Sequence, residues 1–187
     1  NLLNFETDWR TKRKLSGGGI LLDQGIHMVD LLRLFGGNFS EIYSFVSNKY
    51  WNHDVEDNAV AIMKSNTGVV AMLHSTATEW RHRFRMEIGL EKGFITLAGL
   101  LTSTKSYGAE TITIAYASED TNGDPVEKTI HYNKDDSWHN EIYKFINDIK
   151  EDNNIEWGSS FEAKKTMELV YNIYNADKEW STKYKLI

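Results

Sequence analysis

Three ionisable side chains, Asp23, His27 and Asp30, interrupt an otherwise apolar run. Successive residues of an α-helix advance by about 100°, so these three side chains fall within about 60° of one another. The apolar residues around them cover about half of the circumference, which is typical of a helix packed against a core. A carboxylate four residues before an imidazole can fix the tautomer of the ring and favour its charged form.

This spacing predicts a proton-handling pair, Asp23 and His27, on a helix over residues 19–35. Such a pair is more often a structural hydrogen bond than a catalytic dyad, and spacing alone leaves both interpretations open. Ser16 is expected to cap the amino end of the helix, and the glycines at 36 and 37 are expected to end it. Gly25 costs helix stability, which indicates that another backbone or a ligand approaches closely there.

The stretch GGGILLDQGIHMVDLLRLFGG, residues 17–37, resembles the signature G-G-G-x-L-x-D-x-G-x-H-x-x-D of the glucose–fructose oxidoreductase/inositol dehydrogenase (Gfo/Idh/MocA) family. Residues 55–62, the helix around Phe145 and residues 160–170 also resemble the second domain of that family. The resemblance covers nearly the whole chain. It implies that residues 1–187 form a single C-terminal domain for substrate binding and oligomerisation, with a Rossmann domain outside this sequence.

The resemblance also implies a reaction. A sugar or nucleotide-sugar hydroxyl would exchange a hydride with NAD or NADP, which the missing domain would mainly bind. His27 is the expected acid/base, and Asp23 would orient it or bind a neighbouring substrate hydroxyl. The family pattern places a catalytic lysine on the Rossmann domain, so the isolated chain is expected to be inactive. Asp30 is interpreted as structural, holding nearby backbone or ring N–H groups.

The composition is that of a folded domain. The 187 residues are 41% hydrophobic, with six Trp, nine Tyr and eight Phe, which excludes intrinsic disorder. The formal net charge of -6 without a long single-sign run argues against a nucleic-acid partner. The chain has no cysteine, which suits a reducing compartment, and no apolar run of membrane-spanning length. We therefore expect a cytoplasmic protein without a membrane partner.

Alternating polar and apolar residues predict seven strands, joined by short connections rich in turn residues. Such connections favour antiparallel pairing. The fold class is thus α+β, a mostly antiparallel open sheet of about six to eight strands with helices on one face. Further helices are expected over residues 135–151 and 159–179. By resemblance, the other face of the sheet would form a homodimer or tetramer. The predicted strands are 42–49, 58–64, 69–76, 84–90, 93–97, 111–116 and 127–132.

Other residues are weaker candidates. By resemblance, Trp9 and Arg10 could contact the cofactor or substrate, although a Trp anchor beside a solvated Arg explains them equally well. Trp80 and His82 lie in a basic, aromatic cluster that could bind a sugar, and His139 could line a pocket beside His27. An interfacial Trp and exposed histidines are the simpler interpretations.

The glycine run at 17–19 is not a phosphate-binding loop. Neither G-x-G-x-x-G nor G-x-x-x-x-G-K-[ST] is present there, so the chain is not expected to build its own dinucleotide site. The six histidines form no H-x-x-x-H or H-E-x-x-H pattern, and the acidic residues at 54, 56 and 57 look like a loop cluster. No specific metal site is predicted.

Two competing functions remain open. One is a non-catalytic sheet module for dimerisation or protein binding, in which Asp23 and His27 only stabilise a buried helix. The other keeps the family and changes the reaction to NAD-dependent cleavage of a glycosidic bond. The sequence leaves open the sugar, the choice between NAD and NADP, the direction of reaction and the oligomer size.

Overall fold

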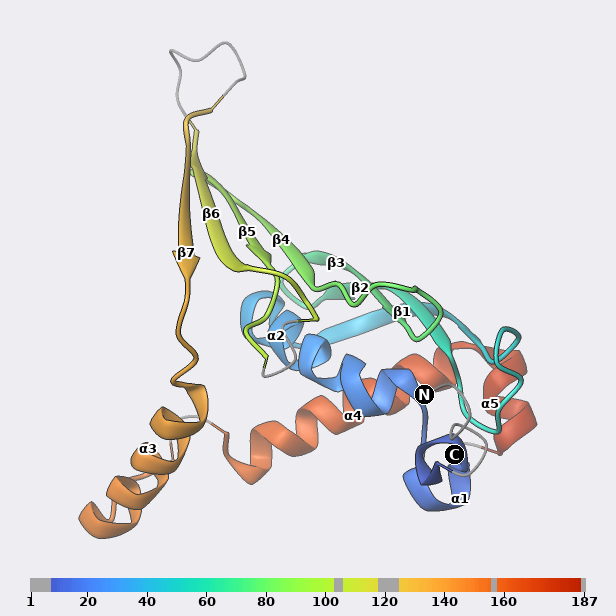
Figure 1. The fold of residues 1–187 in the computed structure, drawn as a ribbon. Helices are drawn as coiled ribbons and strands as arrows, with labels where there is room; N and C mark the ends of the chain where they lie inside the picture. Colours follow the sequence, from blue (N-terminus) through green and yellow to red (C-terminus); the bar gives the residue numbers. More distant parts are fainter. Residues whose placement is uncertain (1–7, 103–105, 118–124, 156–157, 186–187) are drawn as a thin grey trace. The chain divides into compact units, whose positions relative to one another are not determined.

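The computed structural model describes residues 8–102, 106–117, 125–155 and 158–185. The chain folds into two compact units, residues 1–78 with 155–187, and residues 79–154. The α+β class and the seven predicted antiparallel strands are confirmed (Figure 1). Hydrogen bonds join the described strands into one sheet of three and one of four, where the sequence suggested a single sheet.

The first unit contains the three-stranded sheet β1 (Phe39–Ser47), β2 (Asn58–Ser65) and β3 (Val70–Thr76). Each strand pairs antiparallel with the next, and residues in register share a face. Ala59 and Ala61 are each 1% exposed on one face of β2. Their small side chains let helices approach this face closely.

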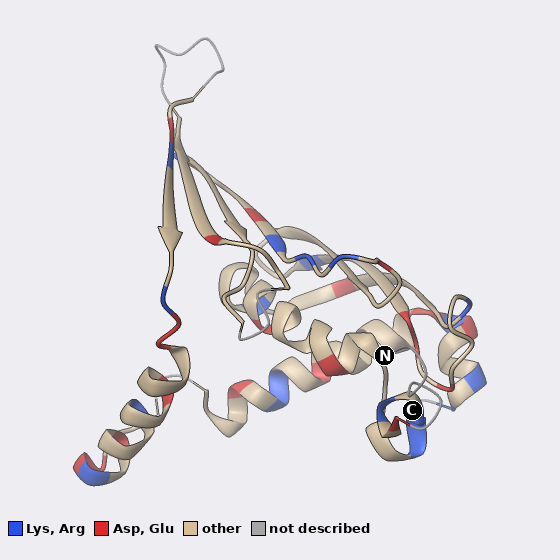
Figure 2. Ribbon diagram, in the orientation of Figure 1, with Lys and Arg blue, Asp and Glu red and all other residues tan. Residues whose placement is uncertain are grey.

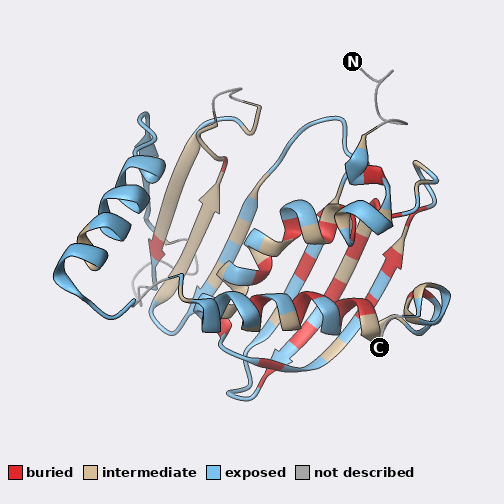
Figure 3. Ribbon diagram, turned by 90° about the horizontal axis from the view of Figure 1, so that it is seen from below, coloured by how far each residue is buried: buried red, intermediate tan, exposed pale blue. Residues whose placement is uncertain are grey.

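Two helices, α2 (Ile26–Gly36) and α4 (Ser160–Ala176), cover that face of the sheet (Figure 3). The other described helical segments of this unit are short: η2 (Trp9–Thr11), α1 (Arg13–Ser16), the π-helical η3 (Leu21–Gly25) and α5 (Lys178–Tyr184). The apolar core contains residues from both covering helices and from η3. Its fully buried members include Leu21, Val29, Val170, Ile173 and Tyr174.

Helix α4 begins at the predicted capping box, because the Ser159 hydroxyl accepts a hydrogen bond from the Glu162 N–H (3.2 Å). The helix predicted to reach residue 179 instead breaks at Asp177. The Asp177 carboxylate accepts a hydrogen bond from the Trp180 N–H (2.9 Å) and so caps the start of α5. It also accepts one from the Val46 N–H of β1 (2.7 Å). An N-cap that also ties down a strand explains why one predicted helix becomes two.

The helix predicted over residues 19–35 differs from the prediction at its start. Residues 21–25 form a π-helical turn before α2, and Ser16 ends α1 instead of capping this helix. The predicted end is confirmed, since Gly37 has φ +76° and its N–H donates to the Arg33 carbonyl (2.9 Å). A Cβ on Gly25 would lie 2.7 Å from the Ser75 Oγ of β3, so the close approach expected at this glycine is made by a side chain and not by a backbone or a ligand.

The second unit contains β4 (Arg85–Leu90), β5 (Gly93–Ala98), β6 (Glu110–Tyr116) and β7 (Glu127–Tyr132), paired in chain order. The two faces of this sheet differ in polarity. One row in register across all four strands is apolar, and the next row, on the opposite face, is mostly threonine, with Thr113 hydrogen-bonded to Thr129 (2.9 Å). The apolar row is Met86, Leu97, Ile112 and Ile130.

Helix α3 (Ser137–Glu151) follows β7 and is strongly amphipathic. None of its residues is buried, so the predicted packing of this helix against a sheet is not seen. Periodicity predicts which face of a helix is apolar, but it does not predict what covers that face. Acidic and basic residues are interspersed along α3 and α5 (Figure 2).

We expect Gly19→Ala to destabilise the chain by about 3 kcal/mol or more. A Cβ at this position would lie 2.0 Å from the Glu56 carbonyl oxygen, and backbone cannot move aside as a side chain can. Urea unfolding of the 187-residue chain measures the effect. Gly89→Ala is the matched control, because a Cβ there meets nothing within 4 Å, and its stability should change by less than about 1 kcal/mol. Equal effects of the two substitutions would contradict this account.

Candidate functional site

A buried carboxylate, Glu56, holds the start of the helix that carries the candidate residues. Glu56 is 1% exposed and lies just before β2. Its Oε2 accepts from the Gly19 N–H (2.8 Å), its Oε1 from the Leu21 N–H (3.1 Å), and its backbone carbonyl from the Ile20 N–H (3.1 Å). One residue therefore satisfies three successive N–H groups at the start of the helical segment, where N–H groups lack helical partners.

Two further groups surround this carboxylate. The Tyr174 hydroxyl of α4 donates to Glu56 Oε1 (2.5 Å), and Arg13 Nη2 lies 3.7 Å from Oε2. Burial, together with the nearby Glu56 charge, raises the pKa of Tyr174, so its hydroxyl stays protonated and available as a donor. The Arg13 guanidinium also lies 3.9 Å from the centre of the Tyr184 ring.

Glu56 and its neighbour Asp57 were not among the predicted site residues, because the acidic residues at 54, 56 and 57 look like a loop cluster in the sequence. Asp57 is 5% exposed, and its Oδ2 accepts from the N–H groups of Tyr50 (2.9 Å) and Trp51 (2.8 Å). Two features of the sequence could have indicated their burial. They directly precede a strand of small apolar residues, and the glycines at 17–19 require another backbone to pack closely against them.

Glu56 also explains why the glycine run is not an anion site. The N–H groups of Gly19 and Leu21, which a phosphate would need, already bind the protein's own carboxylate. The residues at this helix start therefore do not fit a dinucleotide phosphate.

Asp23 and His27 are both exposed on the helix. The structure describes both residues, and no hydrogen bond or ion pair joins them. The predicted contact between Asp23 and His27 is therefore not formed in this structure, in which Asp23 lies in the π-helical turn just before α2. Asp23 instead lies 3.8 Å from the Arg10 guanidinium, which stacks on Trp9 at 4.7 Å.

The structure thus brings together three of the candidates, Trp9, Arg10 and Asp23, on the exposed side of the helix start. Arg10 and Asp23 side chains are 54% and 42% exposed, so their ion pair is weak and both groups remain available to a ligand. His27 lies in the first turn of α2, directly after the π-helical turn η3 that carries Asp23.

Asp30 has a structural setting. It accepts a hydrogen bond from the Thr166 hydroxyl (2.5 Å) and lies 3.8 Å from Arg33. Arg33 in turn binds Glu162 (2.7 Å) and Thr166 (2.7 Å), so these side chains join α2 to α4. The partners of Asp30 are a hydroxyl and a guanidinium, not the backbone or ring N–H groups expected from the sequence.

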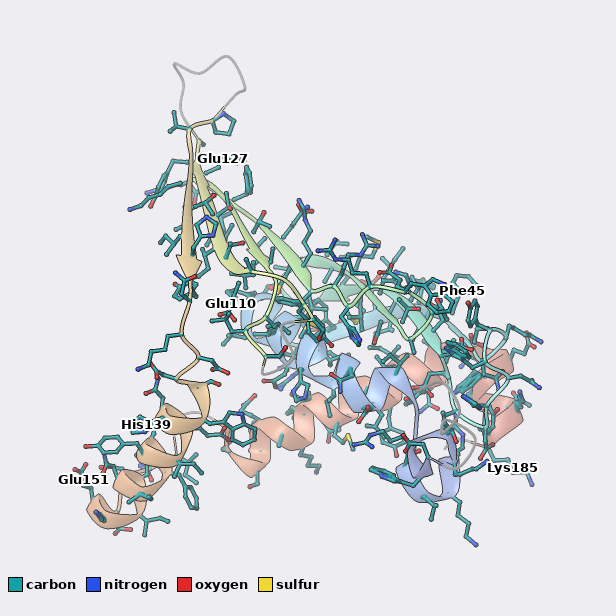
Figure 4. All side chains as sticks on the ribbon, in the orientation of Figure 1. Phe45, Glu110, Glu127, His139, Glu151 and Lys185 are labelled. Atoms are coloured by element: carbon teal, nitrogen blue, oxygen red, sulfur yellow. The ribbon has the colours of Figure 1, made fainter. Side chains whose placement is uncertain are left out.

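The other candidates belong to the second unit. Trp80 is 82% exposed, and the His82 ring lies 5.1 Å from the Tyr107 ring. His139, on α3, stacks on Tyr143 at 6.1 Å (Figure 4).

Within the described part of the chain, no group of three or more His, Asp or Glu could hold a metal ion. Among the same residues, no helix is long and apolar enough to cross a membrane.

The sequence model of the GFO/IDH/MocA C-terminal domain family matches residues 2–96, which is half of the chain and includes the glycine run, Asp23, His27 and Glu56. The chain belongs to this family. The resemblance noted in the signature is thereby confirmed, and the matched residues include α2, Glu56 and all three strands of the first sheet. A comparison with curated proteins found no match.

Solved structures share the fold. Aldose–aldose oxidoreductase from Caulobacter crescentus, complexed with glycerol, has a TM-score of 0.72 and 19% identity over 92% of this chain and 49% of its own. Levoglucosan dehydrogenase, in complex with NADH and levoglucosan, gives 0.72 and 18% over 95% and 52%. The WlbA dehydrogenase from Bordetella pertussis, in complex with NADH and UDP-GlcNAcA, gives 0.67 and 17% over 95% and 49%. The chain therefore spans about half the length of these oxidoreductases.

We expect Asp30 and Asp23 to differ in their contribution to stability. Asp30→Ala should lower the free energy of unfolding by about 1 kcal/mol, because it removes the acceptor of the Thr166 hydroxyl. Asp23→Asn should change it by less than about 0.5 kcal/mol, since its ion pair with Arg10 is solvated. Urea unfolding measures both, and a double-mutant cycle with Thr166→Val should give a non-additive result for Asp30. Equal losses at the two aspartates would contradict the structural role of Asp30.

Proposed function

We propose that this chain is the substrate-binding and oligomerisation domain of an NAD(P)-dependent dehydrogenase that acts on a sugar or nucleotide sugar. One observation carries the proposal. Asp23 and His27 are exposed on a helix whose opposite side, with Leu21 and Val29, is completely buried and whose start is fixed by Glu56. Rigid elements that present solvent-facing acid/base groups are what a positioned catalytic group requires. Family membership supports the same assignment.

His27 is the proposed acid/base. In oxidation, a neutral imidazole nitrogen takes the proton of the reacting hydroxyl, and in reduction the imidazolium returns it to the keto oxygen. Asp23 is proposed to accept a hydrogen bond from a neighbouring sugar hydroxyl, because it is not bonded to His27 and its carboxylate is accessible. A lysine outside this chain is proposed to share the proton transfer.

NAD(P) supplies the hydride acceptor and is proposed to be held mainly outside this chain. The helix start supports this assignment of the cofactor, because its N–H groups already bind Glu56 and are not available to a phosphate.

Trp9 and Arg10 are proposed to contact the cofactor or the substrate beside Asp23. We further propose that Trp80, His82 and His139 contact the substrate, with the exposed Trp80 ring suited to the apolar face of a sugar. The cytoplasm remains the proposed compartment for this cysteine-free chain.

The uncovered face of the first sheet is proposed to join copies of the protein as a homodimer or tetramer. Three side chains in one register row, Tyr43, Ile62 and Met72, are 73%, 53% and 74% exposed. The following row on the same face contains Phe45, which is 80% exposed. A contiguous apolar surface of this kind is typical of a protein interface.

His27→Ala in the full-length protein should lower kcat by about 10²-fold or more while leaving the fold intact. The loss arises from the missing proton acceptor, and His27 makes no buried contact that the fold needs. Oxidation of a panel of sugars and nucleotide sugars, followed by NAD(P)H absorbance, measures it. Wild-type kcat in the variant would remove His27 from the mechanism.

The same assay separates the competing functions. Loss of activity in Asp23→Asn without loss of stability supports the enzyme, whereas loss of stability alone supports a non-catalytic module. Net consumption of NAD(P) by substrate supports a dehydrogenase, and bond cleavage without net consumption supports a glycosidase.

Phe45→Lys should weaken self-association of the full-length protein by at least about 30-fold, because it places a charge within the proposed apolar interface. Sedimentation equilibrium measures the dissociation constant. Val126→Lys is the matched control, since Val126 is 78% exposed and lies outside the first sheet. A monomeric wild type, or equal effects of both variants, would contradict association through this face.

A further inference from the structure

Glu56 holds the backbone of residues 19–21 by more hydrogen bonds than an ion pair with Arg13 would need. Side-chain and main-chain oxygens of this one residue hold the consecutive N–H groups of Gly19, Ile20 and Leu21. The Gly19 carbonyl then accepts from the Asp23 N–H (2.8 Å), so only one hydrogen bond separates the clamped segment from Asp23. The Ser75 Oγ of β3 also donates to the Ile20 carbonyl (3.3 Å).

The carboxylate itself is held from three sides. Tyr174 fixes Oε1 from α4, Arg13 lies beside Oε2, and the backbone N–H groups complete the set. Three donors, the N–H groups of Gly19 and Leu21 and the Tyr174 hydroxyl, bond to its two oxygens. The Arg13 guanidinium lies beside them at ion-pair distance, so the orientation of the carboxylate is fixed. Movement of Glu56 would therefore move the π-helical turn that carries Asp23 and, through it, the first turn of α2 that carries His27.

We propose that Glu56, held by Tyr174, is a positioning residue that sets the place of Asp23 and His27 for the reaction. The inference rests on the proposed function. Glu56 touches no reacting atom, and its effect on catalysis passes through the backbone of residues 19–25. A displacement of about 1 Å in a catalytic group can cost up to about 10²-fold in rate, so a loosened helix start should be visible in kcat.

The adjacent carboxylate supplies a matched control. Asp57 is also buried and also accepts two backbone N–H groups, but these belong to Tyr50 and Trp51 in the connection between β1 and β2. Glu56→Gln replaces one oxygen with an NH2 group, so either Gly19 or Leu21 must face a donor. Asp57→Ala removes the acceptor of the other loop. Both variants lose buried hydrogen bonds, and only the first loosens the helix start.

Amide hydrogen exchange of the full-length protein tests the structural step. Glu56→Gln should accelerate exchange in residues 19–25 by about 10-fold or more and leave residues 48–54 unchanged, and Asp57→Ala should give the reverse pattern. Unchanged protection of residues 19–25 in Glu56→Gln, or equal acceleration of both segments in both variants, would overturn the proposal. If Glu56→Gln does not fold, Tyr174→Phe, which removes a single donor, should give the same segment-specific change more weakly, and its absence there would overturn the proposal.

Kinetics of the same proteins test the catalytic step. Glu56→Gln should lower kcat by about 10-fold or more with the KM for NAD(P) within about twofold of wild type, and Asp57→Ala should keep kcat within about threefold. An equal loss of kcat in both variants would reduce Glu56 to a merely structural role. A wild-type protein that oxidises no sugar would instead remove the proposed function, whereas wild-type kcat in Glu56→Gln would overturn this inference alone.

Discussion

The structure of the first unit depends on keeping one carboxylate buried. An isolated ionised carboxylate away from water is strongly unfavourable, so the groups around Glu56 must supply donors or positive charge. They come from three places in the chain: Arg13, the backbone N–H groups of residues 19 and 21, and Tyr174. These segments are far apart in sequence. The hydrogen bonds and the ion pair of the Glu56 carboxylate therefore fix the helical segment of η3 and α2, the first sheet and α4 relative to one another.

The glycine run follows from this constraint. Gly19 must let its backbone approach that of Glu56, and a Cβ on Gly18 would lie 2.6 Å from the Tyr174 hydroxyl. The glycines therefore make room for the carboxylate and its donor. This differs from the phosphate-binding loops that such a run suggests, in which the freed N–H groups are left open for a ligand.

Local patterns predicted much of the fold, because alternation and turn residues act over a few positions. The seven strands, the end of α2 at Gly37 and the cap of α4 at Ser159 all depend on neighbours in sequence. The errors have a common cause. The Glu56 cap acts across 35 or more residues, and Asp23 pairs with Arg10 of η2 rather than with His27, its neighbour on an α-helical wheel. Periodicity likewise gave α3 an apolar face without predicting what would cover it.

At the same helix start, the groups that stabilise the fold and the groups proposed to bind a ligand lie on opposite sides. Its inner side binds the buried carboxylate and packs Leu21 in the core, and its outer side presents Asp23 and Arg10 to solvent. Exposed polar groups contribute little to folding, so they are free to serve a ligand, whereas the buried groups cannot change partners without a large cost. Under the proposed function, the positive end of this helix is already neutralised by Glu56 and cannot hold the dinucleotide phosphates. On this proposal the domain holds the sugar and moves its proton, and the hydride acceptor is bound mainly by other parts of the protein.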